Sequence, residues 1–413
     1  MKIYLVGGAV RDKLLGITVK DRDWVVVGAS PKDMTQLNYA QVGADFPVFL
    51  HPKTKEEYAL ARTERKKGHG YQGFECHTSP KVSLEDDLLR RDLTINAMAL
   101  DSDNKIIDPF NGQADLKSKT LRHVSQAFAE DPLRILRVAR FAARFDTLGF
   151  HIADDTIQLM QTVEQAGETK HLVAERVWQE TERALSEQSA WVYFETLKKT
   201  GTLGTLFPEI DALFGIPQPP KYHPEIDCGI HALMSLQAAC KLSEATDVRF
   251  ASLIHDLGKA LSPKDNLPHH YGHEKKGLKP IKRLCRQLKA PSQHCTLALL
   301  VSEFHTHVHK VKELKSTTIL KVLKQCDAFR RPERFEKFLL CCEADAKGRT
   351  GFEKSEYPQA TFFRQALQEA QSVSVKSLTK LGLITQDTQG KEIGDLMDQE
   401  RNVRIKRLML RVS

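Results

Sequence analysis

A glycine pair that separates a short apolar run from two aspartates is the feature of this sequence that most restricts its fold. Residues 3–14 read I-Y-L-V-G-G-A-V-R-D-K-L, which predicts a short strand that breaks at Gly7-Gly8 and continues into a helix. Residues 21–27 read D-R-D-W-V-V-V, which predicts a buried strand entered through Asp21 and Asp23. Residues i and i+2 of a strand share a face, so the two carboxylates project side by side. Paired carboxylates repel unless a cation lies between them, and the bare backbone N–H groups of a glycine turn suit an anion.

Composition and charge exclude some classes of protein. The chain has 413 residues, enough for two to four domains, and its net charge of +8 suggests a polyanionic partner that basic residues must recognise by local clustering. Met1-Lys2 leads directly into the first predicted strand, and no apolar run approaches the roughly 20 residues that span a bilayer. The eight cysteines form no C-x-x-C pair, which indicates reduced thiols. We therefore expect a cytoplasmic chain without a membrane segment.

The first 110 or so residues mix strand and helix signals. Residues 46–50 (F-P-V-F-L) and 57–62 (E-Y-A-L-A-R) predict strands, and Ser30-Pro31 predicts the start of a helix. The segment 64–80 is rich in Gly and Lys and has no clear period, which predicts a mobile loop. We expect this half to be α+β with about five strands.

Beyond about residue 120 the strand signal fades and helical periodicity dominates. The segment 216–225 holds four prolines and is the best candidate for a domain boundary. After about Ser372 only weak patterns remain, which predicts a loosely packed tail.

A second motif follows the expected loop. It reads Arg90-Arg91-Asp92-x-x-x-Asn96-Ala97. Taken alone, the two arginines could end a solvated helix, and Asp92 and Asn96 could form a local capping pair at spacing i, i+4.

A third motif, Glu130-Asp131-Pro132-Leu133-Arg134, begins a long helix. Asp131 suits the N-cap and Pro132 the first helical position, so capping alone would explain these two residues. The stripe that follows is harder to explain locally, because four arginines recur at spacings of three and four on one face: Arg134, Arg137, Arg140 and Arg144. Four like charges on one face require an anionic partner.

A fourth group lies in the second half. It comprises the following residues in chain order: His231, the run His255-Asp256-x-Gly258-Lys259, His270, His273, His305 and Asp327. Histidine and aspartate side chains are ready ligands for a transition metal or Mg²⁺. With 16 histidines in the chain, some clustering arises by chance, and we interpret several of them as surface residues: His269, His270, His307 and His309.

The opening motif resembles the nucleotidyltransferase superfamily shared by CCA-adding enzymes and poly(A) polymerases, in its bacterial and eukaryotic class. In that family two aspartates hold two Mg²⁺ ions, one at the RNA 3′-hydroxyl and one at the nucleotide triphosphate. The resemblance assigns this role to Asp21 and Asp23, and contacts with the nucleotide to Gly8 and Arg11.

The second and third motifs match the same family. The resemblance implies that Arg91 and Asp92 recognise the ribose, and that Asp131 and Arg134 read the Watson–Crick edge of the incoming base. A carboxylate accepts from the exocyclic amino group of C or A, and guanidinium donates to a ring acceptor. Two further arginines of the stripe would lie near the phosphates: Arg137 and Arg140.

The fourth group resembles the HD phosphohydrolase domain. The resemblance implies metal ligands at His231, His255, Asp256 and Asp327, with His305 in support. The metal could be Mg²⁺ or a transition ion such as Mn²⁺, Ni²⁺ or Co²⁺. Such a domain would hydrolyse phosphate esters, for example 2′,3′-cyclic phosphates or 2′-nucleotides.

Together the motifs resemble bacterial CCA-adding tRNA nucleotidyltransferases of the type with a C-terminal HD domain. The resemblance implies an α+β head followed by an all-α neck, body and tail that contain the HD domain. Its expected limits are 1–125 for the head, 126–222 for the neck and body, 228–329 for the HD domain and 330–413 for the helical tail. The partners would be CTP, ATP and the acceptor arm and 3′ end of tRNA, bound by a monomer or a homodimer.

Two alternatives stay open. A poly(A) polymerase shares the three head motifs, but it typically carries a basic motif after the aspartate strand, and residues 43–49 (G-A-D-F-P-V-F) lack it. A phosphohydrolase could instead use the first half only to bind nucleotides. Candidate RNA contacts lie in the basic segments 275–283 and 330–334, and segment 64–80 is a candidate for control of the change from C to A addition.

Overall fold

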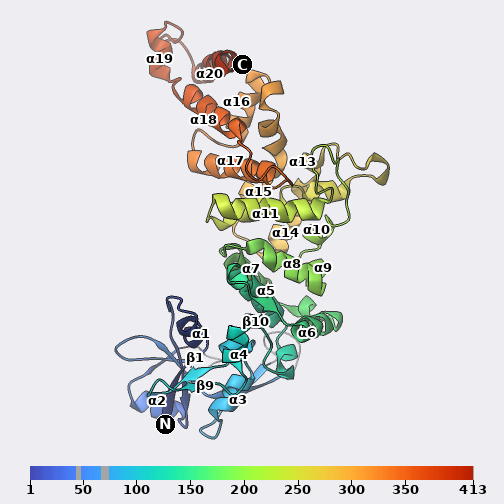
Figure 1. Cartoon of the computed structure of the whole chain (residues 1–413). Helices are drawn as coiled ribbons and strands as arrows, with labels where there is room; N and C mark the ends of the chain where they lie inside the picture. The colour runs from blue at the N-terminus through green and yellow to red at the C-terminus, as the bar shows by residue number, and fades with distance from the viewer. Residues whose placement is uncertain (43–47, 67–73, 413) are drawn as a thin grey trace. The chain divides into compact units, whose positions relative to one another are not determined.

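The computed structural model describes residues 1–42, 48–66 and 74–412. The chain divides into two compact units, Met1–Leu206 and Phe207–Ser413, coloured blue to green and yellow-green to red in Figure 1. The division falls close to the proline-rich segment 216–225, and the finer division into four parts stays a prediction. Each unit is described by itself below.

The first unit is built on a seven-stranded mixed sheet with the order β3-β4-β5-β2-β1-β8-β9. Strand β2 pairs antiparallel with β1 and parallel with β5. The strands are β1 (Lys2–Val6), β2 (Asp23–Val27), β3 (Ala40–Val42), β4 (Val48–Leu50), β5 (Glu57–Leu60), β8 (Ala99–Leu100) and β9 (Ile106–Ile107). The α+β fold is confirmed, but the count of about five strands is too low, because β3, β8 and β9 have only two or three residues and show no alternation.

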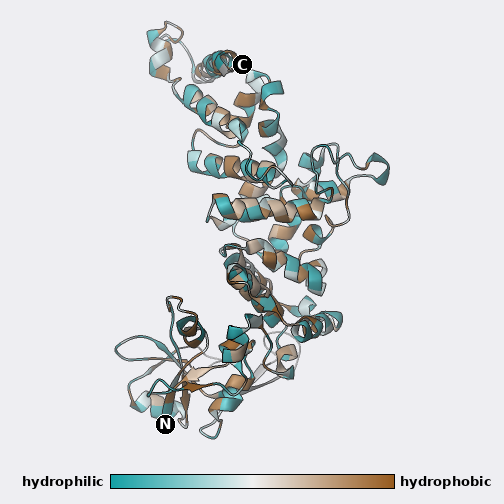
Figure 2. Ribbon diagram, in the orientation of Figure 1, coloured by the Kyte–Doolittle hydropathy of each residue, from teal (hydrophilic) through white to brown (hydrophobic). Residues whose placement is uncertain are grey.

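The central strands are buried on both faces. Val6, Val25 and Leu60 are almost fully inaccessible to solvent, and two apolar clusters cover the sheet. Figure 2 shows brown, apolar strands around β1 and teal loops leaving them. The predicted helix start is confirmed: the Ser30 hydroxyl accepts from the Asp33 N–H at the N-terminus of α2 (Pro31–Gln36).

The expectation of a loop over 64–80 is wrong at both ends of that segment. Strands β6 (Arg62–Lys66) and β7 (Phe74–Thr78) pair antiparallel as a separate ribbon. Residues 67–73, proposed for control of nucleotide choice, lie outside the described residues, as do residues 43–47 of the stretch compared with the poly(A) polymerase motif. The glycines of this segment led us to predict a loop, because glycine is typical of turns and loops.

The rest of the first unit is helical. The helices are α1 (Gly8–Leu14), α3 (Leu84–Leu89), α4 (Gly112–Lys117), α5 (Leu133–Phe145), α6 (Asp154–Gln165), α7 (Ala174–Leu185), α8 (Ala190–Thr200) and α9 (Thr202–Leu206). Helix α5 packs against α7 and α8 and is buried over most of its length. Two short strands, β10 (Thr120–Leu121) and β11 (His151–Ile152), pair parallel beside it.

The described residues of the second unit are helical apart from turns, loops and one isolated β-bridge between Pro217 and Asp227. The helices are α10 (Pro208–Asp211), α11 (Cys228–Leu242), α12 (Thr246–Ile254), α13 (His273–Lys276), α14 (Leu278–Leu288), α15 (Ser292–His309), α16 (Ser316–Gln325), α17 (Pro332–Lys347), α18 (Pro358–Gln371), α19 (Val375–Lys380) and α20 (Gly390–Val412). Its core forms where α11, α12, α15 and α17 pack together.

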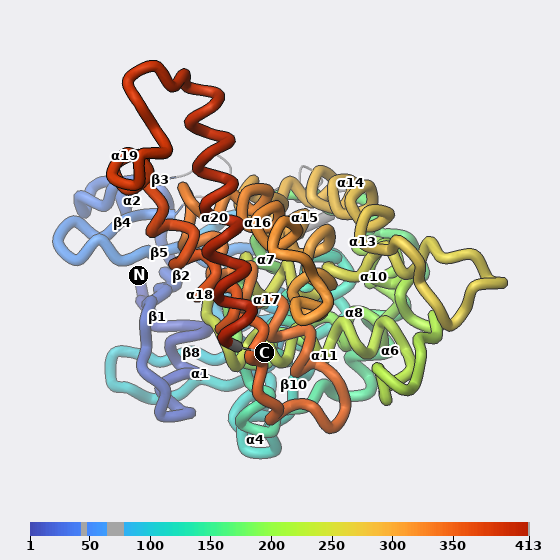
Figure 3. The backbone as a smooth tube through the Cα atoms, turned by 90° about the horizontal axis from the view of Figure 1, so that it is seen from above, coloured from blue at the N-terminus to red at the C-terminus, as the bar shows by residue number. Residues whose placement is uncertain are grey.

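The prediction of a loosely packed tail after Ser372 is wrong. Helix α20 has 23 residues and packs across α16 and α18 (Figure 3). Val373, Leu378 and Ile384 form a buried cluster beneath it.

Two expectations about the whole chain can also be checked against the described residues. The seven cysteines that the structure describes are free thiols, as expected. Nowhere in the described chain does a helix combine the length and apolarity needed to cross a membrane.

Candidate functional site

One cavity of the first unit gathers every residue that the head motifs predicted. Its volume is about 640 Å³, and its lining includes all ten: Gly8, Arg11, Asp21, Asp23, Arg91, Asp92, Asp131, Arg134, Arg137 and Arg140. Ten arginines line it against four aspartates. The excess of positive charge suits a polyanion such as a triphosphate.

The glycine turn and the two aspartates meet where two central strands of the sheet adjoin, at the end of β1 and the start of β2. The register pairs Val6, the last residue of β1, with Asp23, the first residue of β2. Gly7 follows with φ +70°, a backbone conformation that favours glycine, and a Cβ there would lie 2.7 Å from Nη1 of Arg91. The backbone conformation of the turn therefore favours glycine, and the guanidinium of Arg91 from the second motif lies close to it.

Asp21 and Asp23 are exposed at the cavity, and Asp21 precedes the strand. Their oxygen donors fit Mg²⁺, which commonly binds one or two carboxylates and fills its other positions with water and substrate phosphates. The donor set therefore fits the ion that the family resemblance implies.

Asp92 is the anchor of the second motif. Its Oδ1 accepts from the Leu93 N–H and from Asn96 Nδ2, both at 2.9 Å, and its Oδ2 accepts from Arg137 Nε at 2.7 Å. Burial opposes the charged form, but Arg137 and these hydrogen bonds hold the pKa of Asp92 well below its ordinary value. Asp92 is thus an ionised carboxylate that ties the second motif to helix α5.

Arg11 is buried rather than free to reach far into the cavity. Its Nη1 donates to Asn96 Oδ1 at 2.5 Å, and its Nε donates to Asp12 Oδ1 at 2.8 Å. Its guanidinium also lies 5.1 Å from the ring centres of Phe141 and Phe145. Burial lowers the pKa of Arg11, although Asp12 opposes that shift. These contacts fix Arg11 at the wall of the cavity.

Helix α5 begins as predicted, shifted by one residue. The Asp131 carboxylate accepts from the Leu133 N–H at 3.0 Å, which caps the first turn. Arg134, 7% exposed, donates to the carbonyl oxygens of Ala127 and Arg90 at 2.5 and 2.6 Å. The base-reading pair of the resemblance is therefore held rigidly at the start of the helix.

Carboxylates of the protein balance much of the arginine stripe. Arg137 pairs with Asp92, and Arg140 Nε donates to Glu180 Oε2 at 2.6 Å. Arg144 donates to Asp12 Oδ2 at 3.0 Å. The anionic partner that the stripe required is thus partly internal, and the cavity keeps a net positive lining.

The sequence reading missed three residues of helix α7. Glu180, 4% exposed, lies 3.5 Å from Arg183 as well as beside Arg140, and Arg176 lies 3.4 Å from Asp131 Oδ2. Arg176, Glu180 and Arg183 recur at spacings of four and three, so one helical face carries all three. That spacing was visible in the sequence, but no motif directed attention to it.

A second group of titratable residues lies in the interior of the second unit. His231 comes from α11, His255 and Asp256 follow α12, and Asp345 comes from α17. His231 Nε2 lies 3.1 Å from Asp345 Oδ1, and His255 Nε2 lies 3.2 Å from Asp256 Oδ2 and 3.5 Å from Asp345 Oδ2. Histidine and carboxylate donors at this spacing fit a divalent metal ion.

The structure does not bring Asp327 to these histidines. It lies at the end of α16, where its carboxylate pairs with Arg330 at 2.7 Å and lies 3.6 Å from Arg334. Asp345, and not Asp327, is the aspartate that lies beside His231 and His255. Asp345 lies near the end of α17, 18 residues beyond Asp327, and nothing in the local pattern of that helix distinguishes it.

The reading of His309 as a surface residue is also wrong. Its Nε2 lies 2.7 Å from Asp345 Oδ2 and its Nδ1 lies 2.7 Å from the Tyr357 hydroxyl. His305, which we expected in support, lies with Nε2 3.6 Å from Asp256 Oδ1. Burial lowers the pKa of His305 to about 3, so its imidazole is neutral.

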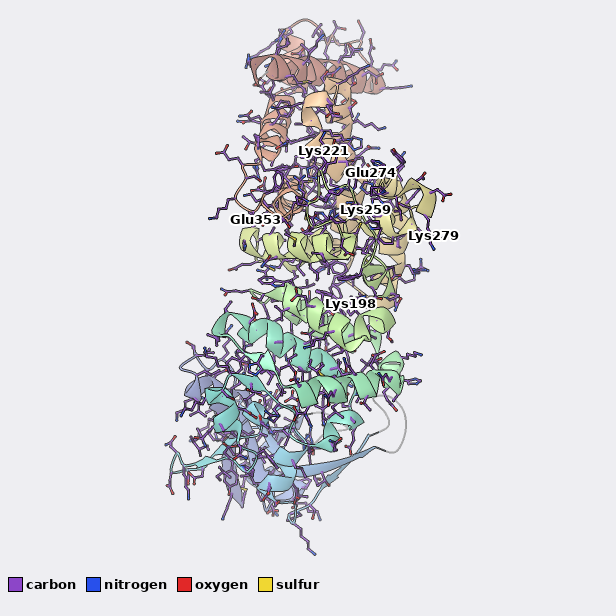
Figure 4. All side chains as sticks on the ribbon, turned by 45° about the vertical axis from the view of Figure 1, so that its right-hand side comes forward. Lys198, Lys221, Lys259, Glu274, Lys279 and Glu353 are labelled. Atoms are coloured by element: carbon purple, nitrogen blue, oxygen red, sulfur yellow. The ribbon has the colours of Figure 1, made fainter. Side chains whose placement is uncertain are left out.

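The proline-rich segment before α11 is part of this centre rather than a plain linker. Glu225 Oε1 lies 3.1 Å from His231 Nδ1, and Gln218 Oε1 accepts from Lys259 Nζ at 2.8 Å. Lys259 also pairs with Asp256 Oδ2 at 2.5 Å. Figure 4 labels Lys259 in the interior of the unit and Lys279, from the basic segment 275–283, at its edge.

Comparison with known proteins agrees with this architecture. Residues 3–122 match the family described as "Poly A polymerase head domain", residues 149–214 match "Probable RNA and SrmB- binding site of polymerase A", and residues 229–331 match "HD domain". A curated relative from Hahella chejuensis, named "Multifunctional CCA protein", is 56% identical over 98% of this chain and 95% of its own. The chain belongs to the multifunctional CCA protein family. A relative of the same name from Acinetobacter baumannii is 57% identical over 97% of this chain and 96% of its own.

Solved structures show the fold of this multifunctional CCA family member. A CCA-adding enzyme in an apo form matches with TM-score 0.66 at 21% identity, covering 100% of this chain and 92% of that one. A Thermotoga maritima CCA-adding enzyme complexed with tRNA matches with TM-score 0.63 at 19% identity, over 100% and 92% of the two chains. Because the sequence identities are about 20%, these two structures show only that the fold is shared.

Proposed function

We propose that this chain adds C, C and A to the 3′ end of tRNA, with CTP and ATP as substrates and pyrophosphate as the leaving group. The observation that carries the proposal is the close relation to curated CCA proteins over nearly the whole chain, together with one cavity that gathers the ten candidate site residues of the three head motifs. The same relation disfavours a poly(A) polymerase and a phosphohydrolase with a merely nucleotide-binding head.

Asp21 and Asp23, at the start of β2, are proposed as the catalytic metal ligands. Asp21 and Asp23 would hold Mg²⁺, which supplies charge stabilisation at the attacking and leaving oxygens. Gly8 and Arg11 would contact the triphosphate. The glycine turn and the two aspartates line the same cavity, which supports the proposal that they bind one nucleotide together.

Choice of nucleotide is assigned to the second and third motifs. Asp131 and Arg134 would read the base, since a carboxylate acceptor beside a guanidinium donor matches the edges of C and A. Arg91 and Asp92 would recognise the ribose. The two remaining arginines are proposed for the phosphates, and their own carboxylate partners keep them fixed before substrate binds: Arg137 and Arg140.

The helical unit is proposed to hydrolyse phosphate esters such as 2′,3′-cyclic phosphates or 2′-nucleotides. Its metal, Ni²⁺ or another divalent ion, would be held by His231, His255, Asp256 and Asp345, with His305 in support. The close carboxylate and imidazole atoms of these residues support the assignment. Repair of damaged tRNA ends would use both activities.

The helical parts are proposed to bind the acceptor arm of tRNA by shape and phosphate contacts. Segments 275–283 and 330–334 remain the candidates, and Lys279 at the edge of its unit is accessible. A cytoplasmic location, a monomer or homodimer, and the division into a head (1–125), neck and body (126–222), HD domain (228–329) and tail (330–413) complete the proposal.

The test is extension of tRNAs that lack one, two or three terminal nucleotides, with each nucleoside triphosphate alone. We expect C on the two shorter substrates with CTP, A on the tRNA ending in CC with ATP, and no long A tail. Long A tails with indifference to CTP would instead identify a poly(A) polymerase. Asp23→Ala should abolish addition, and His255→Ala should abolish hydrolysis while addition continues.

A further inference from the structure

Two cysteines face each other across the hairpin of α14 and α15. These helices pack side by side and only residues 289–291 join them, which is the arrangement of an antiparallel helical hairpin (Figure 3). Cys285 lies five residues before Ala290 and Cys295 lies five residues after it, so the hairpin brings the two positions opposite each other. The Cys285 thiol and the Cys295 sulfur share a hydrogen bond.

The turn of the hairpin holds both cysteines in place. Lys289 ends α14 in the left-handed conformation, and the Ala290 N–H donates to the carbonyl oxygen of Cys285 at 2.9 Å. On the other side of the turn, the Cys295 N–H donates to the carbonyl oxygen of Pro291 at 3.3 Å. Backbone hydrogen bonds therefore fix the position of each cysteine relative to the turn.

The two thiols have different surroundings. Cys285 is 4% exposed and lies on the apolar face of α14, between the buried side chains of Leu284 and Leu288. Cys295 is half-buried, and the exposed Lys282 is close enough to stabilise its thiolate. A small reagent in solvent can therefore reach Cys295, whereas Cys285 is shielded from it.

The neighbouring groups favour a thiolate at Cys295. The hydrogen bond from the Cys285 thiol, together with the ammonium of Lys282, lowers the pKa of Cys295 to about 7, although partial burial opposes this shift. The same hydrogen bond and burial raise the pKa of Cys285, which therefore keeps its proton. The thiolate is the reactive form of cysteine, and a thiol whose pKa lies near the ambient pH is an efficient nucleophile.

Most of the other described cysteines lack these features. Burial raises the pKa of four of them, which makes their thiols unreactive: Cys228, Cys326, Cys341 and Cys342. We therefore expect Cys295 to react before any of these four.

We propose that Cys285 and Cys295 are a reversible redox pair that reacts with hydrogen peroxide, with Cys295 as the attacking thiol and Cys285 as the resolving thiol. An accessible thiolate beside a second cysteine is the usual arrangement of redox-sensitive cysteines. Nothing in the assignment depends on the proposed function of the chain.

The reaction has two steps. The Cys295 thiolate attacks one oxygen of hydrogen peroxide, the O–O bond breaks, and hydroxide leaves and takes a proton from solvent, so that Cys295 becomes a sulfenic acid. The Cys285 sulfur then attacks the Cys295 sulfur, the S–O bond breaks, and the leaving hydroxide takes the Cys285 proton. The two thiols lose two electrons in total, and these reduce the peroxide to two molecules of water.

A disulfide at this place would join two helices that carry different proposed tasks. Helix α14 presents exposed basic side chains such as Lys279, which belong to the segment proposed for tRNA contacts. Helix α15 carries His305 beside the candidate metal centre. The oxidation state of the pair therefore determines whether these two helices are covalently linked.

The test locates the disulfide in the full chain. The reduced protein, in a buffer with a chelator that prevents metal-catalysed oxidation, is treated with one equivalent of hydrogen peroxide. Remaining thiols are alkylated, and the chain is digested without reductant for mass spectrometry. We expect one linked pair of peptides that contain Cys285 and Cys295, and recovery of both thiols after treatment with dithiothreitol.

Serine variants separate the two roles. Cys295→Ser should keep its remaining thiols under the same treatment, whereas Cys285→Ser should accumulate a sulfenic acid at Cys295 that a dimedone reagent traps. Cys240→Ser removes a half-buried cysteine of α11 and is the matched control, so it should still form the disulfide. In the unaltered chain, the rate of Cys295 alkylation by iodoacetamide should rise with pH about a midpoint near 7.

Several results would overturn the proposal. These are a disulfide between other cysteines, loss of thiols from Cys295→Ser equal to that of the parent chain, and oxidation of Cys295 to a sulfinic acid while Cys285 remains a thiol. An alkylation midpoint at about 8.5, the ordinary pKa of cysteine, would contradict the role of Cys295. That last measurement uses the unaltered chain, so it decides the question even where a serine variant fails to fold.

Discussion

Asp131→Asn tests base reading without disturbing the helix that carries it. In the structure Asp131 Oδ1 caps α5 by accepting from the Leu133 N–H, and Oδ2 lies 3.4 Å from Arg176. Asparagine caps helices as well as aspartate does, so the cap survives the change. The lost pair with Arg176 is partly exposed and contributes at most about 1 kcal/mol. The free energy of unfolding should therefore change little.

The effect on nucleotide choice should be much larger. A hydrogen bond to a charged acceptor contributes about 1.5–3 kcal/mol, and each 1.4 kcal/mol corresponds to a factor of ten. Loss of the bond between the Asp131 carboxylate and the amino group of C or A should lower kcat/KM for CTP and ATP by about tenfold to about 150-fold. Asparagine also brings N–H donors, so the use of UTP should rise relative to CTP.

Single-nucleotide extension of truncated tRNA with each triphosphate measures these ratios directly. Glu130→Gln is the matched control, because the neighbouring carboxylate does not line the cavity. If Asp131→Asn used CTP and ATP within about threefold of the parent chain, a loss smaller than the weakest charged hydrogen bond predicts, Asp131 would not be the base reader.

Three further changes test the two sites and the charge pairs that hold them. Asp345→Asn should abolish metal binding and phosphate-ester hydrolysis by the helical unit, whereas Asp327→Asn should leave both unchanged in metal analysis and a phosphatase assay. Glu180→Ala leaves the buried guanidinium of Arg140 unpaired, so the free energy of unfolding of the first unit should fall by about 3–5 kcal/mol in denaturant titrations. Charge pairing holds the pKa of Asp92 below its ordinary value. Its contribution to stability should therefore be complete above about pH 4 and be lost as pH falls toward the lower folded-state pKa, as thermal unfolding across that range would show.

Each of these expectations has a contrary result. Equal loss of hydrolysis in Asp345→Asn and Asp327→Asn would mean that Asp345 has no special role as a ligand. Unchanged stability after Glu180→Ala would mean that Arg140 finds another acceptor. Arg137→Ala removes the main ion partner of Asp92, so an unchanged acid profile in that chain would contradict the third expectation.

Local signals in the sequence predicted the parts of the site that local structure determines. The glycine turn, the paired aspartates and the cap at Asp131 each depend on neighbours within a few residues, and the structure places all of them at one cavity. The arginine stripe predicted an anionic partner. Only the three-dimensional packing of α7 on α5 could supply Glu180 as part of that partner.

Long-range pairing explains what the sequence reading missed. Asp345 and His309 meet because α15 and α17 pack side by side, and no spacing along the chain expresses that contact. The tail was missed for a related reason: α20 is anchored by residues of α16 and α18, and its own pattern is weak. Strands of two residues, such as β8, are too short to show a period at all.

The contacts around the candidate metal centre of the helical unit show how long a segment would have to be to carry that centre by itself. The match to the HD family ends at residue 331. His231, however, contacts two residues beyond that point, through a hydrogen bond to the carbonyl oxygen of Gly348 and a contact with the carboxylate of Asp345. Before the start of the family match, the carbonyl oxygen of Pro217 lies 3.0 Å from His270 Nε2. A fragment cut at the family limits would therefore lose Asp345, which is proposed as a ligand, and several groups that contact the histidines. The segment that carries all of these contacts runs from residue 217 to residue 357, because the Tyr357 hydroxyl lies 2.7 Å from His309 Nδ1.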